Sequence, residues 1–249
     1  MKNVHLPSFL KPEGSFDLER IGSDYDGGYL TDKRDMNEAN ILIGLGINND
    51  WSFEKQFIKC KNIPLQAFDA SVNFFQLFKL LFQSRFITKS LYSILSFKSF
   101  FSNERVLNKL FVGYDNIDEN FISFNTVIND YSKNSNKIFV KIDIEGWEYR
   151  ILDEIIKNQD KICGLIIEFH EVDLNMERIK SFVKKINLNI AHCHCNNYGP
   201  IASKGIPTVI ELTFSSHKAL SQGISLPHDL DQPNNPKNQE FEIIFKNNF

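Results

Sequence analysis

The sequence predicts an α/β fold in which a mostly parallel sheet is covered by helices on both faces. Short apolar runs typical of strands alternate with amphipathic runs typical of helices along the 249 residues. A βαβ unit is recognisable at residues 39–68, where a strand, a glycine turn, a helix and a second strand follow one another. The run GLIIEFH at residues 164–170 is apolar almost throughout, as expected of a strand buried on both faces.

The predicted elements can be placed in order along the chain. Residues 1–35 are polar and rich in turns, with Asp26-Gly27-Gly28-Tyr29 as a turn signal. The βαβ unit comprises strand 39–45, a helix at 52–60 with Ser52 as its expected N-cap, and strand 63–68. The remaining expected elements are strand 110–114, helix 121–131, strand 137–142, helix 147–157, strand 164–170, helix 176–186, strand 188–195, strand 207–214 and edge strand 240–245. No linker or internal repeat is visible, so we expect one domain over residues 1–249.

Residues 73–103 differ in character from the rest of the chain. They are rich in phenylalanine and leucine at helical spacing, with lysine and arginine interspersed. We expect a helical insert packed on the core, because amphipathic helices in globular proteins usually pack. The alternative is a lid, an acceptor-recognition element or a membrane-surface helix, since the charges of the segment are basic.

Composition and charge narrow the class of protein. The 28 basic and 31 acidic residues give a net charge of −3, with no basic block, so a nucleic-acid partner is not expected. No run approaches the roughly 18 apolar residues of a membrane span, and the first residues lack the apolar core of a signal peptide. Four cysteines do not make a disulfide scaffold in a chain of this size. We therefore expect a cytoplasmic globular protein, and the sequence is compatible with a homo-oligomer.

Two carboxylates lie at the end of the predicted strand 137–142. The octet at residues 141–148 (KIDIEGWE) follows the apolar run 138–140 of this strand and leads into a helix-like run at 149–157, which places Asp143 and Glu145 at or just past the carboxyl end of the strand. Ligands of open α/β sheets bind in the crevice at this edge. Because buried acids without partners are costly, we expect the octet to form part of a binding or catalytic site.

A glycine turn follows the first strand of the βαβ unit. Gly44-Leu45-Gly46 lets the backbone approach a ligand closely. The third glycine of the dinucleotide fingerprint would fall at Asn49, which disfavours pyrophosphate. Asp69, at the end of the second strand, suits the hydroxyls of a ribose. Together these features indicate a nucleoside cofactor without pyrophosphate, such as S-adenosylmethionine, whereas each glycine alone fits a plain tight turn.

A family resemblance adds to this interpretation. Residues 141–152 (KIDIEGWEYRIL) resemble the signature of the FkbM-type S-adenosylmethionine-dependent methyltransferases. Other segments are similar to bacterial relatives of that group: Arg20-Ile21-Gly22, Asp26-Gly27-Gly28-Tyr29, residues 43–46, Phe68-Asp69, Ile167-Glu168, the segment from His192 to Gly199, and residues 207–214. The resemblance covers most of residues 18–245 and explains the insert at 73–103 least.

The resemblance implies a Rossmann-like class I methyltransferase fold. Its sheet has seven strands, and the last strand is antiparallel and inserted between the fifth and the sixth. Within this fold Gly44, Gly46 and Asp69 would hold S-adenosylmethionine, and the segment Asp26, Gly27, Gly28 and Tyr29 would lie near its methionine end. Asp143 and Glu145 would lie where cofactor and acceptor meet.

The acceptor side has several polar candidates. Glu168 and His170 are two apart on one strand and share a face, as His192 and His194 do on the next. In the implied strand order Glu168, Glu211 and one of these histidines form a row across neighbouring strands. His170 and His194 are the candidate general bases.

A divalent metal is the alternative to a base. Asp143, His170 and His194 would then hold the metal, which would lower the pKa of an acceptor hydroxyl. The plainer interpretation is that His192 and His194 are hydrogen-bonded structural residues.

The sequence thus predicts an S-adenosylmethionine-dependent O-methyltransferase. The expected acceptor is a small polyhydroxylated molecule, a sugar or nucleotide-linked sugar for a surface glycan, and Asp143, Glu168, His170 and His194 are the candidate catalytic residues. One alternative is a metal-dependent hydrolase that uses the same four residues. The other is a methyltransferase-like partner protein without activity, with the insert as its interface.

Overall fold

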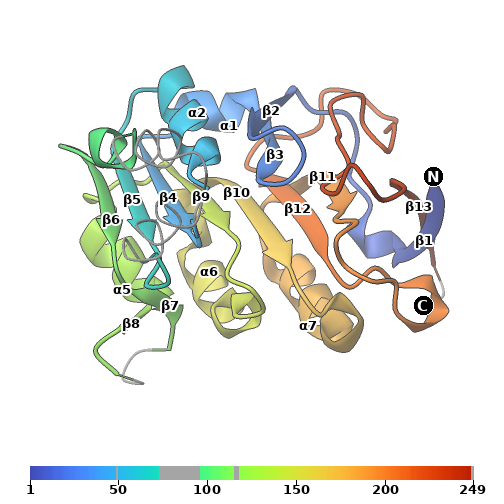
Figure 1. The fold of residues 1–249 in the computed structure, drawn as a ribbon. Helices are drawn as coiled ribbons and strands as arrows, with labels where there is room; N and C mark the ends of the chain where they lie inside the picture. The colour runs from blue at the N-terminus through green and yellow to red at the C-terminus, as the bar shows by residue number, and fades with distance from the viewer. Residues whose placement is uncertain (49, 73–95, 115–117, 248–249) are drawn as a thin grey trace, which may run out of the picture.

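A seven-stranded sheet organises the computed structural model, which describes residues 1–48, 50–72, 96–114 and 118–247 (Figure 1). The strand order is β11-β12-β10-β9-β4-β5-β6. Strand β12 runs antiparallel between β10 and β11, and the other pairings are parallel. The strands are β4 (Ile41–Leu45), β5 (Leu65–Phe68), β6 (Arg105–Asn108), β9 (Ile138–Ile142), β10 (Ile162–Phe169), β11 (Asn189–Cys195) and β12 (Ile210–Ser215). The predicted α/β class, with its seven strands and inserted antiparallel strand, is confirmed.

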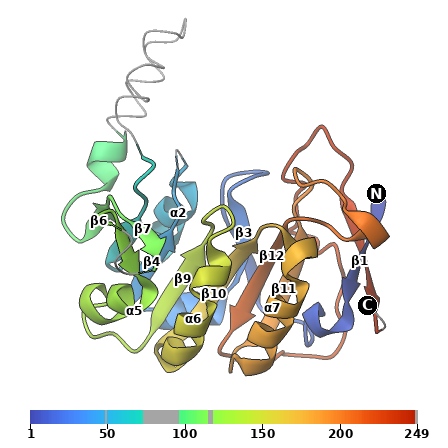
Figure 2. The ribbon, with the colours of Figure 1, turned by 90° about the horizontal axis from the view of Figure 1, so that it is seen from below.

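Helices cover both faces of this sheet, as Figures 1 and 2 show. The helices are α1 (Lys33–Glu38), α2 (Ser52–Cys60), α5 (Phe124–Thr126), α6 (Leu152–Asn158) and α7 (Val172–Lys185). Alternate side chains of β4 enter different cores: Ile43 packs in the cluster that contains α6 and α7, and Leu42 in the cluster that contains α1 and α2. All five residues of β9 are buried, because its strand lies between these two layers.

Two small ribbons lie in the N-terminal segment, which the sequence predicted as turns. Strand β1 (Lys2–Pro7) pairs in parallel with β13 (Phe241–Lys246), and both views place this ribbon at the β11 end of the molecule. Strands β2 (Leu18–Gly22) and β3 (Gly28–Asp32) form a hairpin. The predicted edge strand 240–245 is therefore a strand, but it pairs with β1 and not with the main sheet. Pairing over such a sequence distance leaves no local signal.

The third strand of the main sheet was predicted in the wrong place. It is β6 at residues 105–108, an edge strand that is only partly buried and therefore lacks an apolar run. The predicted strand 110–114 corresponds to β7 (Phe111–Gly113), which pairs with β8 (Phe121–Ser123) outside the main sheet. The predicted helix 121–131 consequently begins as a strand and becomes helical only at Phe124.

The cap of α2 also differs from the prediction. The helix covers the predicted residues, but Ser52 is its first residue and not its N-cap. The side chain of Asp50 does the capping, since its Oδ1 accepts a hydrogen bond from the Ser52 backbone N–H at 2.8 Å. Other helix starts shift by a few residues: the predicted helix 147–157 begins as a 3₁₀ turn at Glu148–Arg150, and α7 begins at Val172.

Most of the predicted insert, residues 73–95, lies outside the described residues. Of the remainder, residues 96–100 are helical, and Phe97 and Phe100 are buried in the core cluster on the α2 side. The ring of Phe97 packs edge-on against Trp51, with 5.0 Å between ring centroids. Within the described ranges, no helix combines the length and hydropathy needed to cross a bilayer.

Candidate active site

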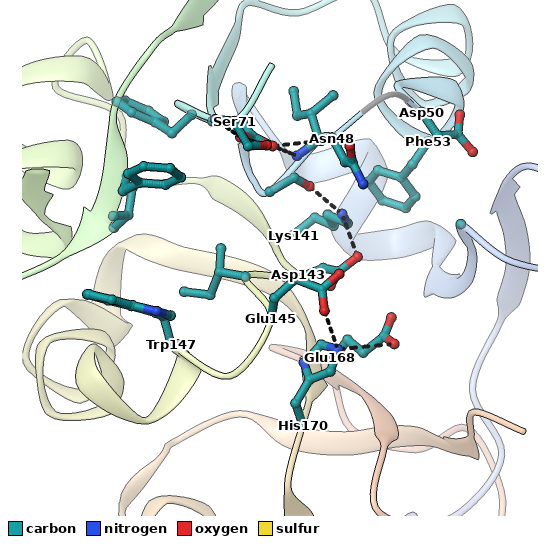
Figure 3. A pocket seen from close by; sticks show the side chains of 18 of the residues that line it. Asn48, Asp50, Phe53, Ser71, Lys141, Asp143, Glu145, Trp147, Glu168 and His170 are labelled. Carbon is teal, nitrogen blue, oxygen red and sulfur yellow. Dashed lines mark hydrogen bonds and ion pairs between the residues drawn. The ribbon is translucent and has the colours of Figure 1, made fainter. Parts of the chain in front are cut away.

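A cavity of about 950 Å³ opens at the carboxyl ends of the central strands. Its lining includes Gly46 after β4, Asp69 after β5, Asp143 after β9 and His170 after β10. This is the edge at which open α/β sheets bind ligands. The volume lies at the upper end of the usual range for small-molecule sites, so the cavity has room for more than one small ligand. Figure 3 shows the side chains that converge on it.

Asp69 organises the turn that follows β4. Its Oδ2 accepts hydrogen bonds from the backbone N–H groups of Ile47 (2.9 Å) and Asn48 (2.6 Å). Its Oδ1 accepts from the backbone N–H (2.7 Å) and the hydroxyl (2.6 Å) of Ser71. Burial raises the pKa of Asp69, but these four donors outweigh it and hold the pKa below its ordinary value. The carboxylate is therefore an ionised anchor of the turn.

The two predicted glycines of the turn have different surroundings. Gly46 has a φ of +76°, and a Cβ there would lie 1.6 Å from the carbonyl oxygen of Asp143, so only glycine lets β4 and β9 end this close together. Gly44 lies inside β4 and is not part of the cavity lining. A Cβ at Gly44 would lie 2.9 Å from Glu54 Oε1, so this glycine makes room for the buried Glu54 carboxyl.

Lys141 links the glycine turn after β4 to Asp143 after β9. Its buried Nζ donates to the carbonyl oxygen of Gly46 at 2.8 Å and to Asp143 Oδ2 at 3.4 Å. Burial lowers the pKa of Lys141, but the charges of Asp143, Glu54 and Glu168 raise it above its ordinary value. The lysine is therefore a buried cation that holds Asp143 in place.

The hydroxyl of Tyr29 bridges two carboxyl groups. It lies 2.8 Å from Glu168 Oε2 and 3.1 Å from Asp143 Oδ2. Burial, followed by the charges of Asp143 and Glu211, raises the pKa of Glu168 well above its ordinary value. The other oxygen of Glu168 accepts from the side-chain amide of Asn196 at 2.9 Å. Glu168 is accordingly a buried acid, hydrogen-bonded on both oxygens, beside Asp143.

His170 lines the cavity, and Glu148 contacts the other side of its ring. Its Nδ1 lies 3.1 Å from Glu148 Oε1, and its Nε2 lies 3.5 Å from Glu145 Oε2 and 3.9 Å from Glu168 Oε1. Burial lowers the pKa of His170, but the hydrogen bond and charge of Glu148, together with Glu168 and Asp143, raise it to about 9. Figure 3 shows His170 next to Glu168, beyond Asp143.

His194 does not reach the cavity. The predicted row across the strands is present, since Glu168 pairs with Glu211 and Glu211 with His194. His194 is buried with its Nδ1 3.2 Å from Glu211 Oε2 and its Nε2 3.5 Å from Glu240 Oε1. The C-terminal segment supplies Glu240 and covers this end of the row. His194 is thus a structural residue here, as is His192, which pairs with Asp231 at 2.8 Å, and the expectation of His194 as base or metal ligand is corrected.

The predicted N-terminal element only partly lines the cavity. Asp26, Gly27 and Tyr29 contribute to its wall, together with Asp50 from the segment before α2. Gly28 lies inside the β2–β3 hairpin, where a Cβ would lie 2.2 Å from the carbonyl oxygen of Ser23. Burial raises the pKa of Asp26, whose Oδ1 accepts from the Asn234 amide at 3.2 Å.

Three of these residues have a geometry that suits a metal ion. Asp143, Glu168 and His170 each offer one ligand atom, and these atoms lie within 4.8 Å of one another. Two carboxylates and an imidazole are common ligands of divalent cations. The predicted metal ligands were Asp143, His170 and His194, and in the structure Glu168 takes the place of His194 in this group.

Sequence reasoning missed several residues of the site. Lys141 and Glu148 belong to the octet, but no local pattern shows that one holds Asp143 and the other His170. Asn196 and Tyr198 line the cavity from the loop after β11. In the sequence both belong to the polar run from His192 to Gly199, in which a histidine, His194, was the predicted site residue.

Comparison with known proteins supports a family assignment. Residues 82–197 match the model of the methyltransferase FkbM domain, and this range contains the octet, Glu168, His170 and Asn196. It begins after the glycine turn and Asp69. A comparison with curated proteins gives no match.

Solved structures with a similar fold include several methyltransferases. A putative sarcosine dimethylglycine methyltransferase from Galdieria sulphuraria has a TM-score of 0.41 and 9% identity, over 73% of this chain and 80% of that one. A precorrin-6y C5,15-methyltransferase from Geobacter metallireducens has a TM-score of 0.38 and 10% identity, over 74% and 84%. TYW2 from M. jannaschii, in complex with AdoMet, has a TM-score of 0.34 and 12% identity, over 81% and 88%.

Similarity at this level carries no information on cofactor or substrate. The strand order, the cavity at the strand ends and the domain match agree with the resemblance seen in the sequence. Residues 82–197 match the methyltransferase FkbM domain, and the chain is a methyltransferase.

Proposed function

We propose that this chain is an S-adenosylmethionine-dependent O-methyltransferase that acts on a small polyhydroxylated acceptor. One observation carries the proposal. An ionised aspartate with a glycine turn forms one end of the cavity, and Asp143, Glu168 and His170 converge on the other. A cofactor end and a proton-handling end within one cavity are what methyl transfer to a hydroxyl requires.

The residues at the first end fit a nucleoside. Asp69 is ionised and suits ribose hydroxyls, although all four of its acceptor positions are used by protein donors. The Ser71 hydroxyl is the one donor that can rotate away, which would free Oδ1 for a ribose hydroxyl. Asp26 and Asp50, which also line the cavity, suit the ammonium group of the methionine portion. Bound S-adenosylmethionine supplies a methyl group on a positively charged sulfur.

The other end handles the acceptor and its proton. Bound S-adenosylmethionine would supply its methyl carbon to the acceptor oxygen, with the sulfur as the leaving group. The hydroxyl proton passes to a base, for which we propose His170 Nε2, the ring nitrogen that faces the cavity. Asp143, fixed by Lys141 and Tyr29, lies where the two ligands meet and orients the acceptor hydroxyl.

A divalent cation is the second way to lower the pKa of the hydroxyl. The donor set of Asp143, Glu168 and His170 fits such an ion. These residues would hold it, and it would act as a Lewis acid on the acceptor oxygen. The hydrolase alternative loses support, because His194, its fourth residue, lies outside the cavity.

For the acceptor we propose a sugar, free or nucleotide-linked, of the kind used in surface glycans. The acceptor end supports this with hydrogen-bonding groups and an exposed tyrosine ring. Glu145 and Tyr198 both line the cavity, and Tyr198 is 58% exposed. Carboxylates accept bonds from sugar hydroxyls, and an aromatic face packs against the apolar side of a sugar ring.

Transfer of a labelled methyl group from S-adenosylmethionine to a panel of sugars and nucleotide-linked sugars tests the proposal. We expect one acceptor to gain one methyl group per turnover, and Asp143→Asn to reduce this transfer strongly. The same reaction with a chelator distinguishes the two ways of activating the hydroxyl. Activity persists if His170 acts as the base, and it disappears if a bound cation is required. Absence of transfer to every hydroxylated acceptor, with labelling of amines or thiols instead, would overturn the assignment to oxygen.

A further inference from the structure

Glu148 is the most completely buried carboxyl group beside the cavity, with an exposed fraction of 0%. It begins the 3₁₀ turn at the end of the octet. Its Oε1 accepts hydrogen bonds from the backbone N–H groups of Ile144 (3.2 Å) and Gly146 (3.1 Å). The same oxygen lies 3.1 Å from Nδ1 of His170. One oxygen atom therefore joins the loop after β9 to the histidine after β10.

The backbone around this contact is shaped to allow it. Glu145 and Gly146 have φ angles of +54° and +95°, and this turn wraps the loop around the Glu148 carboxylate. The neighbouring Tyr149 donates from its hydroxyl to the carbonyl oxygen of His170 at 2.6 Å. His170 is thus held at its ring by Glu148 and at its backbone by Tyr149.

A carboxylate in this position determines which ring nitrogen carries hydrogen. Glu148 Oε1 already accepts from two backbone N–H groups, so Nδ1 is the donor in the contact with this oxygen. In the neutral imidazole the other nitrogen, Nε2, then keeps its lone pair. Nε2 is the nitrogen that lies near Glu145 and Glu168 in the cavity.

We propose that Glu148 is a positioning residue of the methyltransferase, which holds His170 as the Nδ1–H tautomer and presents the free lone pair of Nε2 to the acceptor. The inference rests on the proposed function and deepens it, because both a general base and a cation ligand at His170 need that lone pair. It explains why an acid is buried where an apolar residue would fill the space at lower cost. Outer partners that orient a functional histidine in this way typically contribute roughly 10–100-fold to activity.

The tautomer can be read directly by NMR. Ring-nitrogen shifts of ¹⁵N-histidine in the whole chain, assigned with His170→Gln and recorded above the pKa of the ring, distinguish the two tautomers. We expect Nδ1–H for His170 in the wild type and a population shifted toward Nε2–H in Glu148→Met. Glu148→Gln keeps the shape and one acceptor oxygen, which guards against a variant that fails to fold. We expect it to retain part of the Nδ1–H population.

A second readout compares the effect of the substitution on kcat with its effect on ligand binding. We expect kcat of Glu148→Gln to fall roughly tenfold or more, with the dissociation constant of S-adenosylhomocysteine and the acceptor KM within about twofold of the wild type. A purely structural role would weaken binding together with turnover. Glu148→Asp keeps the charge and should recover part of the lost kcat.

Asp231→Asn provides a matched control. It breaks another buried carboxylate–histidine pair, Asp231 with His192, that does not line this cavity. It should lower stability without moving the His170 resonances or kcat. The inference is overturned if His170 is Nε2–H in the wild type, or stays Nδ1–H in Glu148→Met. If the wild type does not bind the cofactor, the proposed function is contradicted. The tautomer measurement still tests the contact between Glu148 and His170 in that case.

Discussion

The hydroxyl of Tyr29 lies 2.8 Å from Glu168 Oε2 and 3.1 Å from Asp143 Oδ2, so one side chain of the N-terminal hairpin joins two acids of the main sheet. The Tyr29 hydroxyl is the donor in both contacts, so the two carboxyl groups share its single hydrogen. Burial raises the pKa of Tyr29 well above its ordinary value, as do the charges of Asp143 and Glu168, so the ring remains neutral. The hairpin therefore takes part in the electrostatics of the site.

Tyr29→Phe tests this bridge. Without the hydroxyl, the buried Glu168 and the half-buried Asp143 lose a shared partner, which we expect to cost about 1–3 kcal/mol of stability and to reduce kcat by roughly tenfold or more. Thermal unfolding and steady-state kinetics measure the two effects. Tyr25→Phe is the control, because the Tyr25 side chain belongs to the same hairpin turn and is 46% exposed. Wild-type kcat in Tyr29→Phe would show that the bridge has no part in turnover.

Gly46→Ala should be far more damaging than its size suggests. The φ of +76° already costs roughly 1–2 kcal/mol for a residue with a Cβ, and that Cβ would fall 1.6 Å from the carbonyl oxygen of Asp143. We expect cofactor binding to be lost and the free energy of unfolding to fall well beyond the strain cost alone. Gly223→Ala is the matched control, since Gly223 has a φ of +98° and a Cβ at this position would meet none of the described residues within 4 Å. Equal losses in the two variants would contradict the close approach of the two strand ends.

Stability should decline as the pH rises through the range in which Glu54 titrates. Burial raises the pKa of Glu54 from 4.5 to about 7, against the lowering effect of Lys141. Between these values Glu54 is more protonated in the folded state than in the unfolded state, so its contribution to stability is greatest below pH 4.5 and falls until about pH 7. At 1.36 kcal/mol per pKa unit, the share of Glu54 is about 3 kcal/mol.

Glu54→Gln isolates this effect. Urea unfolding at a series of pH values should show a shallower decline in the variant than in the wild type. A decline remains, because burial also raises the pKa of Asp35 to about 7. The exposed Glu177→Gln should follow the wild-type curve. Parallel curves for Glu54→Gln and the wild type would show that Glu54 does not titrate in this range.

The pH dependence of activity should report His170. Because its pKa is raised to about 9, the imidazole is mostly protonated at neutral pH, and kcat/KM should rise with pH through that value. Glu148→Gln removes the main cause of the elevation, so the rising limb should move to lower pH. The profile is measured in the presence of a chelator to exclude bound cations. A limb that does not move in Glu148→Gln would contradict the assignment of this limb to His170.

The sequence predicted well those features that local pattern determines. Helix α2 has the predicted bounds, β9 ends at Ile142 as predicted, and Glu168, Glu211 and His194 form the expected row. These follow from apolar periodicity and from the fixed strand order of the fold. The ribbon of β1 and β13 could not be predicted, because it joins residues at opposite ends of the chain.

The site itself was only partly predictable for a related reason. His194 and His170 look equivalent in the sequence, since each lies near the carboxyl end of a predicted strand. The difference is that Glu240 and Asn234 of the C-terminal segment close over Glu211 and His194, whereas His170 stays open to the cavity. Glu148 was overlooked because its role depends on a contact with a different strand.

Calorimetric titration of the purified chain with S-adenosylhomocysteine tests the central claim most directly. We predict one site per chain, binding that is lost in Asp69→Ala, and binding that is retained in Ser71→Ala, because the Ser71 hydroxyl is the donor that a ribose hydroxyl replaces on Asp69. A wild-type chain that releases no heat of binding at any concentration, while its melting temperature is also unchanged by the ligand, would contradict the account.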